Sequence, residues 1–179
     1  MRGPAKRSML LVAAVALLAF AAPASAATRT VDDDHLQCPD AQYTSIEAAV
    51  QSAAPGDTVQ VCAGTYQETV TVDKANLKLY STPRQAAIIR APAVIPTVTG
   101  AIVDVTATGV RLERVTITGP GGGPCNSLRY GVFVGNGGSA DIRDNRITEI
   151  HDNPFGGCQN GVGVRIGSQA LGQVGHGTV

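Results

Sequence analysis

The sequence predicts an all-β solenoid that begins with one short helix. Two observations lead to this prediction: a capped helix followed by short alternating strands between Tyr43 and Val72, and a self-similar pattern of short strands after Ala101. A repeat of fixed period is the sequence signature of solenoids, in which each repeat stacks on the next. The composition agrees, because the chain has 21 glycines, no tryptophan and only 4% aromatic residues, and a narrow solenoid core has little room for large rings.

Residues 1–26 are predicted to form a secretory signal peptide. They have a basic start, an apolar stretch from Met9 to Ala22, and a small-residue cleavage motif, Ala24-Ser25-Ala26. The apolar stretch is too short for a membrane span, which needs about 20 residues. Cleavage before Ala27 would therefore leave a secreted protein, extracellular or at the cell surface, with no membrane span.

The charge balance argues against nucleic acid as a partner. The formal net charge of the whole chain is +0, from 14 basic and 14 acidic residues. Removal of the basic residues of the signal peptide would leave the mature chain mildly acidic, at about −3. Such a chain lacks the basic patch that nucleic-acid binding requires.

An N-terminal polar segment, residues 27–43, contains three adjacent carboxylates, Asp32, Asp33 and Asp34. Calcium binding is the functional interpretation of such a run, and a solvated linker or edge strand is the structural one. We prefer the structural interpretation, because the glycine-spaced loop of an EF-hand is absent. No metal or cofactor site is predicted.

The cap helix is expected over about residues 44–54. Thr44 is a suitable N-cap, and Glu47 three residues later completes a capping box. Pro55-Gly56-Asp57 then ends the helix. So short a helix is not stable alone, and it must pack its apolar face against the strands that follow. Helical spacing puts four residues on that face: Ile46, Ala49, Val50 and Ala53.

The helix and the strands after it resemble the N-terminal segment of right-handed parallel β-helix proteins of the pectin-lyase-like superfamily. The matching residues are Thr44, Ile46, Ala49, Gly56, Asp57, Val59, Val61, Gly64, Thr65, Tyr66 and Glu68. The resemblance implies a right-handed parallel β-helix over residues 44–179, with rungs from residue 58 onward. It leaves the activity open, because the superfamily contains lyases, hydrolases, esterases, epimerases and non-enzymatic adhesins.

A repeat supports this fold in the second half of the chain. The segment Val110–Ile117 recurs about thirty residues later as Ala140–Ile147, and a third copy begins at Val162. With a two-residue insertion, the third copy continues over residues 172–179. The apolar residues of successive copies should stack inside as one long core. The chain reaches Val179 within a strand of the third copy, so we expect a β-helix that is C-terminally incomplete.

One polar residue interrupts the apolar pattern of the repeat. Asn145 occupies the position that Val115 has in the first copy. It resembles the asparagine ladder of β-helices, where side-chain amides bond to backbone groups at a bend. This predicts a structural role for Asn145.

The four cysteines are expected to form disulfides, because the chain is predicted to be exported. Of the three pairings that four cysteines allow, we predict Cys38–Cys62 and Cys125–Cys158. The first pair would tie the entry segment to the strand after the cap helix. The second would join two glycine-rich loops whose cysteines are offset by about one repeat. Zinc is disfavoured, since no C-x-x-C pair occurs.

The densest polar cluster comprises Asp141, Arg143, Asp144, Arg146, Glu149, His151 and Asp152. The repeat alignment brings opposite charges together in three pairs: Asp141 with Arg111, Arg143 with Glu113, and Asp144 with Arg114. Such pairs indicate charge pairing across the strands of a solvated sheet, which we favour over catalysis. Each exposed pair stabilises the fold by about 0.2–1 kcal/mol.

If the chain is catalytic, the candidate residues are Arg146, Glu149, His151 and Asp152. Arg146 is included because the alignment places it opposite Thr116, without an acidic partner. The other three lie on the loop that follows. His176 is a further candidate, near Asp144 in the next repeat.

Two function classes remain. The favoured one is a non-enzymatic extracellular module that binds polysaccharide or a surface partner along its flat faces. The alternative is a carbohydrate-active enzyme, a pectate-lyase-like polysaccharide lyase or an epimerase on uronate-containing polysaccharide, or a truncated remnant of one. Lyases of this superfamily use a basic residue, often with bound calcium, to remove a proton beside the uronate carboxylate. Charges that neutralise from rung to rung predict the first class, and an unpartnered basic residue beside carboxylates predicts the second.

Overall fold

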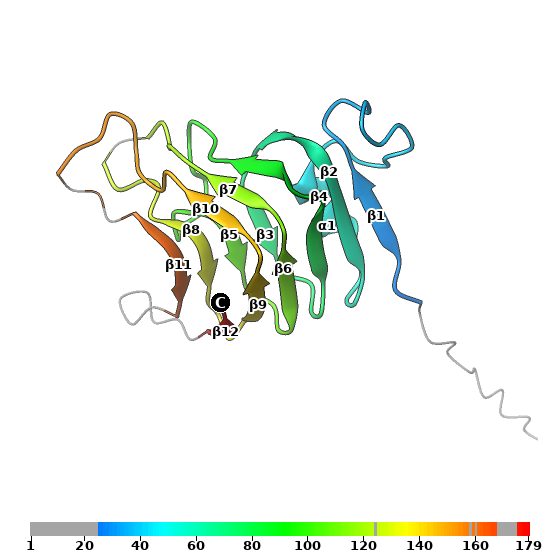
Figure 1. Cartoon of the computed structure of the whole chain (residues 1–179). Helices are drawn as coiled ribbons and strands as arrows, with labels where there is room; N and C mark the ends of the chain where they lie inside the picture. The colour runs from blue at the N-terminus through cyan, green and yellow to red at the C-terminus, as the bar shows by residue number, and fades with distance from the viewer. Residues whose placement is uncertain (1–24, 124, 158, 160, 168–174) are drawn as a thin grey trace, which may run out of the picture.

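The computed structural model describes residues 25–179 apart from 124, 158, 160 and 168–174. Residues 1–24, which hold most of the predicted signal peptide, lie outside this described part. Within it, the chain forms one short helix and a succession of short parallel strands (Figure 1). No helix of the described part is long and apolar enough to cross a membrane.

The elements follow one another in short pieces. The N-terminal third holds β1 (Thr28–Val31), α1 (Ile46–Ser52), β2 (Thr58–Gln67) and β3 (Val70–Val72). The middle holds β4 (Lys78–Arg90), β5 (Ala101–Val105), β6 (Val110–Glu113) and β7 (Thr116–Thr118). The last part holds β8 (Tyr130–Val134), β9 (Ser139–Arg143), β10 (Arg146–Thr148), β11 (Val162–Ile166) and β12 (His176–Thr178).

Two parallel sheets form the walls of the solenoid. The first runs in the order β1-β2-β4-β6-β9-β12, with β7 and β10 continuing it beside the second half of β4. The second runs in the order β11-β8-β5-β3. Each strand pairs with the equivalent strand of the next turn, as Figure 1 shows for β6 and β9. The predicted parallel β-helix with one short N-terminal helix is confirmed.

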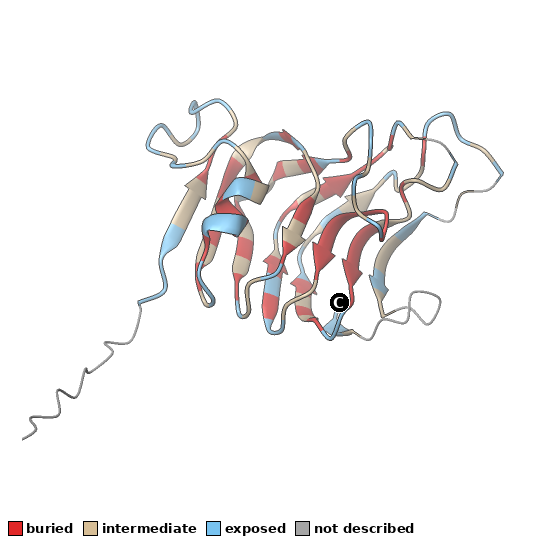
Figure 2. Ribbon diagram, turned by 180° about the vertical axis from the view of Figure 1, so that it is seen from behind, coloured by how far each residue is buried: buried red, intermediate tan, exposed pale blue. Residues whose placement is uncertain are grey.

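The core consists of apolar columns that run from turn to turn. Val59, Leu79, Leu112 and Ile142 are successive partners on β2, β4, β6 and β9, and all are buried. Buried residues line the inner side of both sheets, as the red segments of Figure 2 show. Because side chains alternate along a strand, the residues between these core positions face outward. This alternation defines the outer face on which a site would lie.

The register between the first two copies of the repeat is as predicted. Val110 lies opposite Ala140, and Leu112 opposite Ile142. Asn145 also has the predicted structural role: its Nδ2 donates to the Leu112 carbonyl at 2.8 Å and its Oδ1 accepts from the Val115 amide at 3.0 Å.

The alignment predicted for the third copy is wrong. His176 lies opposite Ser139, and Thr178 opposite Asp141, so His176 is not level with Asp144. Residues 172–174 of that copy lie outside the described part. The copy is rich in glycine and offers few apolar residues, and register is only weakly specified where the apolar pattern is sparse.

The N-cap of α1 is Ser45, not the predicted Thr44. The Ser45 hydroxyl accepts from the Ala48 amide at 3.2 Å. The predicted reciprocal bond of Glu47 is replaced by longer-range contacts, because its carboxylate accepts from the Thr71 amide at 2.7 Å and from Gln51 at 2.9 Å. Thr44 and Ser45 are both good N-caps, so sequence alone did not separate them.

A second group caps the same helix from a distance. The Glu68 carboxylate accepts from the amides of Ile46 at 2.8 Å and Glu47 at 2.9 Å, and from the Ser45 hydroxyl at 2.7 Å. These amides belong to the first turn of α1, which has no partners within the helix. Glu68 therefore fixes the helix to the turn between β2 and β3, where it covers the end of the core.

The disulfide Cys38–Cys62 is confirmed, with a Cα–Cα distance of 6.3 Å. It ties the loop after β1 to the middle of β2. The second predicted pair includes Cys158, which lies outside the described residues, so the pairing of Cys125 with Cys158 stays a prediction.

Candidate functional site

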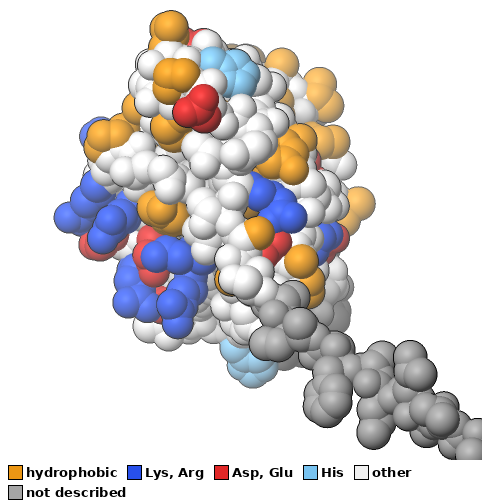
Figure 3. All heavy atoms as spheres, turned by 90° about the vertical axis from the view of Figure 1, so that its right-hand side faces the viewer, with side chains coloured by type: hydrophobic (Ala, Val, Ile, Leu, Met, Phe, Trp, Pro, Cys, Tyr) orange, Lys and Arg blue, Asp and Glu red, His pale blue; other side chains and the backbone are white. Residues whose placement is uncertain are grey.

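Half of the outer face of the first sheet carries charges that neutralise one another. Glu113 on β6 pairs with Lys78 on β4 at 3.2 Å and with Arg143 on β9 at 3.9 Å. Arg143 also forms an ion pair with Asp141 on its own strand. Figure 3 shows Lys and Arg side chains gathered with Asp and Glu side chains on one side of the molecule. Most of the charge on this half therefore cancels.

Two of the three predicted charge pairs need correction. Arg143 does pair with Glu113, as predicted. Asp144 pairs with Arg84 at 2.9 Å rather than with Arg114. Arg111 lies opposite Asp141 in register, but among the described residues it forms no ion pair. The backbone explains the case of Arg114, because Arg114 and Asp144 both have positive φ, of 61° and 61°, and so leave the regular alternation of side chains.

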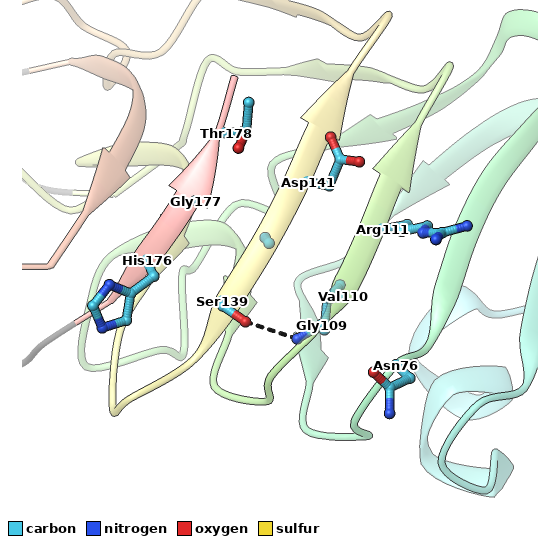
Figure 4. Close-up of a pocket in the computed structure, with 10 residues that line it drawn as sticks. Asn76, Gly109, Val110, Arg111, Ser139, Asp141, His176, Gly177 and Thr178 are labelled. Atoms are coloured by element: carbon cyan, nitrogen blue, oxygen red, sulfur yellow. Dashed lines mark hydrogen bonds between the residues drawn. The ribbon is translucent and has the colours of Figure 1, made fainter.

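A shallow recess of about 510 Å³ lies beside this charged half (Figure 4). Arg111, Asp141 and His176 contribute to its lining from three successive strands, β6, β9 and β12. The Ser139 hydroxyl accepts from the Gly109 amide at 2.8 Å across the recess. In Figure 4, His176 lies on the opposite side of β9 from Arg111, so these titratable groups do not meet at one point.

The other half of the outer face of the first sheet carries few charged side chains. It consists of the second half of β4 together with β7 and β10, and its outward positions form two rows across the strands. One row is Ile88, Thr116 and Arg146, and the other is Arg90, Thr118 and Thr148. Gln67 extends the second row on β2. These described positions hold no carboxylate and no histidine, which leaves the two arginines as their only charged side chains.

Arg90 and Arg146 are both exposed, and neither has an ion-pair partner among the described residues. For Arg146 this agrees with the sequence prediction. Arg90 was missed, because its place in the row depends on the pairing of β4 with β7, which no local pattern indicates. The only available signal was that it ends a strand just before Pro92.

The loop after β10 brings two of the predicted residues together. His151 Nε2 and Glu149 Oε2 are 2.9 Å apart. The hydrogen bond from His151 Nδ1 to the Asp152 carbonyl, at 3.1 Å, together with Glu149, raises the pKa of His151. The Phe155 ring meets the His151 ring edge-on, with centroids 5.7 Å apart. A histidine paired with a carboxylate in this way is able to hold or move a proton.

Asp152 points in the other direction, into the protein. Its side chain is 1% exposed, and its two oxygens accept from the amides of Ser127 and Leu128, each at 2.8 Å. These bonds hold the glycine-rich loop after β7 against the loop after β10. In this geometry Asp152 positions the loop that carries Glu149 and His151.

A smaller recess of about 250 Å³ lies between the arginine rows and these loops. Its polar side chains are Gln67, Arg90 and Asn153, and its remaining lining includes Pro120 and Gly122. The recess therefore presents one guanidinium and two amides, which are groups that bind carboxylates and hydroxyls.

The acidic run of the N-terminal segment is engaged with the backbone. Oxygens of Asp32, Asp33 and Asp34 lie within 4.8 Å of one another, and such oxygens are the ligands of a hard cation such as calcium. However, Asp32 accepts from the Cys38 amide at 2.6 Å, Asp33 from the Thr65 amide at 2.9 Å, and Asp34 from the Leu36 amide at 2.9 Å. These bonds shape the loop that the disulfide closes.

No protein-family profile and no curated protein matches the chain. Among solved structures it is similar to the pectin methylesterase from Aspergillus niger in its deglycosylated form, with a TM-score of 0.53 and 19% sequence identity over 70% of this chain. It is equally similar to the penultimately deglycosylated form, with a TM-score of 0.53 and 20% identity over 70% of this chain. The match covers 44% of each of those chains, so this chain spans less than half of their length. The likeness shows that the chain shares the parallel β-helix fold of these structures.

Proposed function

We propose that this chain is a secreted, non-enzymatic β-helix module that binds an acidic, uronate-containing polysaccharide across β4, β7 and β10. The observation that carries the proposal is the pair of exposed arginines, Arg90 and Arg146, which have no ion-pair partner among the described residues and lie in rows of strand positions without carboxylates. Elsewhere on the same sheet, Lys78 and Arg143 form ion pairs with acids, and Arg111 lies opposite Asp141 in register. The rows that hold Arg90 and Arg146 have no acid at any of their positions, which supports an anionic ligand there.

The spacing of the arginines suits an extended polymer. Arg90 and Arg146 are separated by two strand spacings and two residues, which puts their Cα atoms about 12 Å apart. Thr116 lies between them, and its hydroxyl, which donates to the Gln85 carbonyl at 3.0 Å, can still accept a hydrogen bond from a sugar hydroxyl. Guanidinium groups bind carboxylates through two parallel hydrogen bonds, so two non-adjacent uronates of one extended chain would meet the two arginines.

The surroundings agree with this function. The recess beside Arg90 adds the amides of Gln67 and Asn153 at one end of the rows. Phe155 is 77% exposed close to Asn153, and an exposed aromatic ring can stack on the apolar face of a sugar. The disulfide Cys38–Cys62 fits an oxidising, extracellular location. The fold neighbours are named for pectin, which is an acidic polysaccharide.

The second candidate is a carbohydrate-active enzyme on the same polysaccharide, a lyase or an epimerase. The observation that favours it is the Glu149–His151 pair at 2.9 Å on the loop that follows Arg146. In this version, Arg146 or His151 would remove the proton beside the uronate carboxylate, and calcium, if the lyase requires it, would supply positive charge that stabilises the carbanion formed there. Binding is preferred because Asp152, a third predicted catalytic residue, is buried and bonded to two amides.

The test compares polysaccharides that differ only in charge. The oxidised, mature protein is titrated with polygalacturonate, with its fully methyl-esterified form, and with neutral dextran, by isothermal calorimetry. The proposal predicts binding to polygalacturonate, weakened by salt, and none to dextran. Equal binding to the esterified and free forms would contradict the role of the arginines.

A second assay separates binding from catalysis. The same mixtures, with and without calcium, are followed at the absorbance of unsaturated uronates. A calcium-dependent rise that is lost in Arg146→Ala would replace the binding proposal with a lyase. Product analysis by magnetic resonance covers the epimerase version, since epimerisation changes the sugar without a new double bond.

A further inference from the structure

A buried carboxylate binds three groups near the N-terminal end of the described chain. Asp57, in the turn after α1, is 3% exposed. One of its oxygens accepts from the Ala27 amide nitrogen at 2.7 Å, and the other accepts from the Ala54 amide at 2.7 Å and forms an ion pair with Arg29. Asp57 therefore connects β1, the end of α1 and the start of β2.

Ala27 is held at both of its backbone groups. Its nitrogen donates to Asp57, and its carbonyl accepts from the Thr58 amide at 2.8 Å. The two residues before it, Ser25 and Ala26, are exposed. Within the described residues, the first contacts with the fold are therefore made at Ala27, and removal of Ser25 and Ala26 would uncover no part of the core.

We propose that Asp57 is a preformed binding site for the α-ammonium group that signal-peptide cleavage creates on Ala27. Hydrolysis of the Ala26–Ala27 bond by a signal peptidase leaves a carboxylate on the departing peptide and an amine on Ala27, which takes up a proton. A neutral amide donor 2.7 Å from the carboxylate becomes a full positive charge with three donors at the same place. The inference is independent of the polysaccharide proposal.

The charged groups around this point leave Asp57 available to the new terminus. On β1, Arg29 forms an ion pair with Asp57. Arg29 also donates hydrogen bonds to the Ser52 hydroxyl at 2.9 Å and to the Ser52 carbonyl at 2.8 Å. The last turn of α1 carries no basic residue.

The cations on the neighbouring elements have acids of their own. In the turn before β4, Lys74 pairs with Asp73 at 2.6 Å, and on β4 Lys78 pairs with Glu113 at 3.2 Å. Asp57 would therefore be matched by two cations, Arg29 and the terminus of Ala27. Processing would then strengthen the attachment of the edge strand β1 to the helix cap.

The experiment begins with the full-length precursor expressed in a secreting host. The start of the exported protein is determined by N-terminal sequencing, and the pKa of its α-amino group by the pH dependence of its acetylation, followed by mass spectrometry. An ordinary α-amino group titrates near pH 8. We expect Ala27 as the first residue, and an α-amino pKa at least one unit above that value, seen as an acetylation rate about tenfold slower near pH 7.

Two variants make the result specific. Asp57→Asn should return the α-amino pKa to its ordinary value, whereas Asp73→Asn, which removes a neighbouring carboxylate, should leave it raised. A variant with Gly-Ser placed after the cleavage motif moves the ammonium away, while the Ala27 amide still donates its hydrogen bond to Asp57. The melting temperature of this variant should be lower than that of the natural mature chain at pH 7.

The sign of the pH dependence follows from the raised pKa. The stabilisation by the ammonium is fully present below the unfolded value near pH 8 and is lost as the pH rises through the folded value. The melting temperatures of the natural and Gly-Ser forms should therefore converge only as the pH rises above the raised α-amino pKa. A mature chain that begins elsewhere, an ordinary α-amino pKa in the natural protein, or equal melting temperatures at pH 7 would each overturn the proposal.

Discussion

Asn145 provides the sharpest test of how the stack of rungs is held together. Its amide spans two backbone groups of the preceding turn, the Leu112 carbonyl and the Val115 amide. Leu112 is 1% exposed and Val115 is fully buried, so water has little access to either group. Replacement by alanine removes both partners at once.

The expected magnitude follows from these contacts. Each hydrogen bond contributes about 1 kcal/mol net, and leaving a buried donor or acceptor unpaired costs about 1–3 kcal/mol. Allowing for relaxation, Asn145→Ala should lower the free energy of unfolding by about 2–4 kcal/mol. For a domain of this size, 1 kcal/mol corresponds to about 2–4 °C, so the melting temperature should fall by about 4–16 °C.

Urea unfolding of the mature protein measures the effect, with Arg146→Ala as the control. Arg146 is the next residue, and its side chain is exposed and makes no hydrogen bond among the described residues, so its replacement should change the stability by less than about 0.5 kcal/mol. Asn145→Asp keeps the acceptor for the Val115 amide but loses the donor to the Leu112 carbonyl. Its loss of stability should fall between those of Asn145→Ala and Arg146→Ala. An Asn145→Ala loss no larger than that of Arg146→Ala would refute the asparagine-ladder reasoning.

Two further predictions concern the N-terminal end. Replacing Cys38 and Cys62 together by alanine removes a cross-link between residues separated by 24 positions, which should cost about 3 kcal/mol in urea unfolding; a loss below about 1 kcal/mol would contradict a constraining role. The hydrogen bond from Ala27, with those from Ala54 and Arg29, lowers the pKa of Asp57 below its ordinary value. Asp57 therefore contributes stability that is fully present above about pH 4 and is lost as the pH falls through the folded pKa. Stability curves from pH 7 to pH 2 should therefore be shallower in Asp57→Asn than in the natural chain, and parallel curves would contradict this.

The sequence predicted the parts of the fold that repeat. Leu112 and Ile142 align because apolar residues alternate strictly around them, and a one-residue slip would turn every side chain to the wrong face. Asn145 stood out against that pattern, and its role was confirmed. The third copy lacks such markers, and there the alignment of His176 failed.

The capping and site residues that were missed depend on contacts between distant segments. Glu68 caps α1 from more than twenty residues away, and Arg90 joins Arg146 only through the pairing of β4 with β7 and β10. Charge pairs were predicted from register alone, yet Asp144 turned to Arg84 because positive φ redirects its side chain. Sequence patterns report what is periodic, whereas these contacts are set by turns and loops.

The central claim is that unpartnered arginines make β4, β7 and β10 a surface for acidic polysaccharide. Its most direct test is the affinity for polygalacturonate of Arg90→Gln and Arg146→Gln, with Arg165→Gln as a control that removes the same charge from an exposed position on the other sheet. A lost contact worth about 1–1.4 kcal/mol predicts about five- to tenfold weaker binding for each of the first two variants and an unchanged affinity for the control. Equal weakening in all three would mean that only net charge matters, and unchanged binding in Arg90→Gln and Arg146→Gln would contradict the assignment of this face.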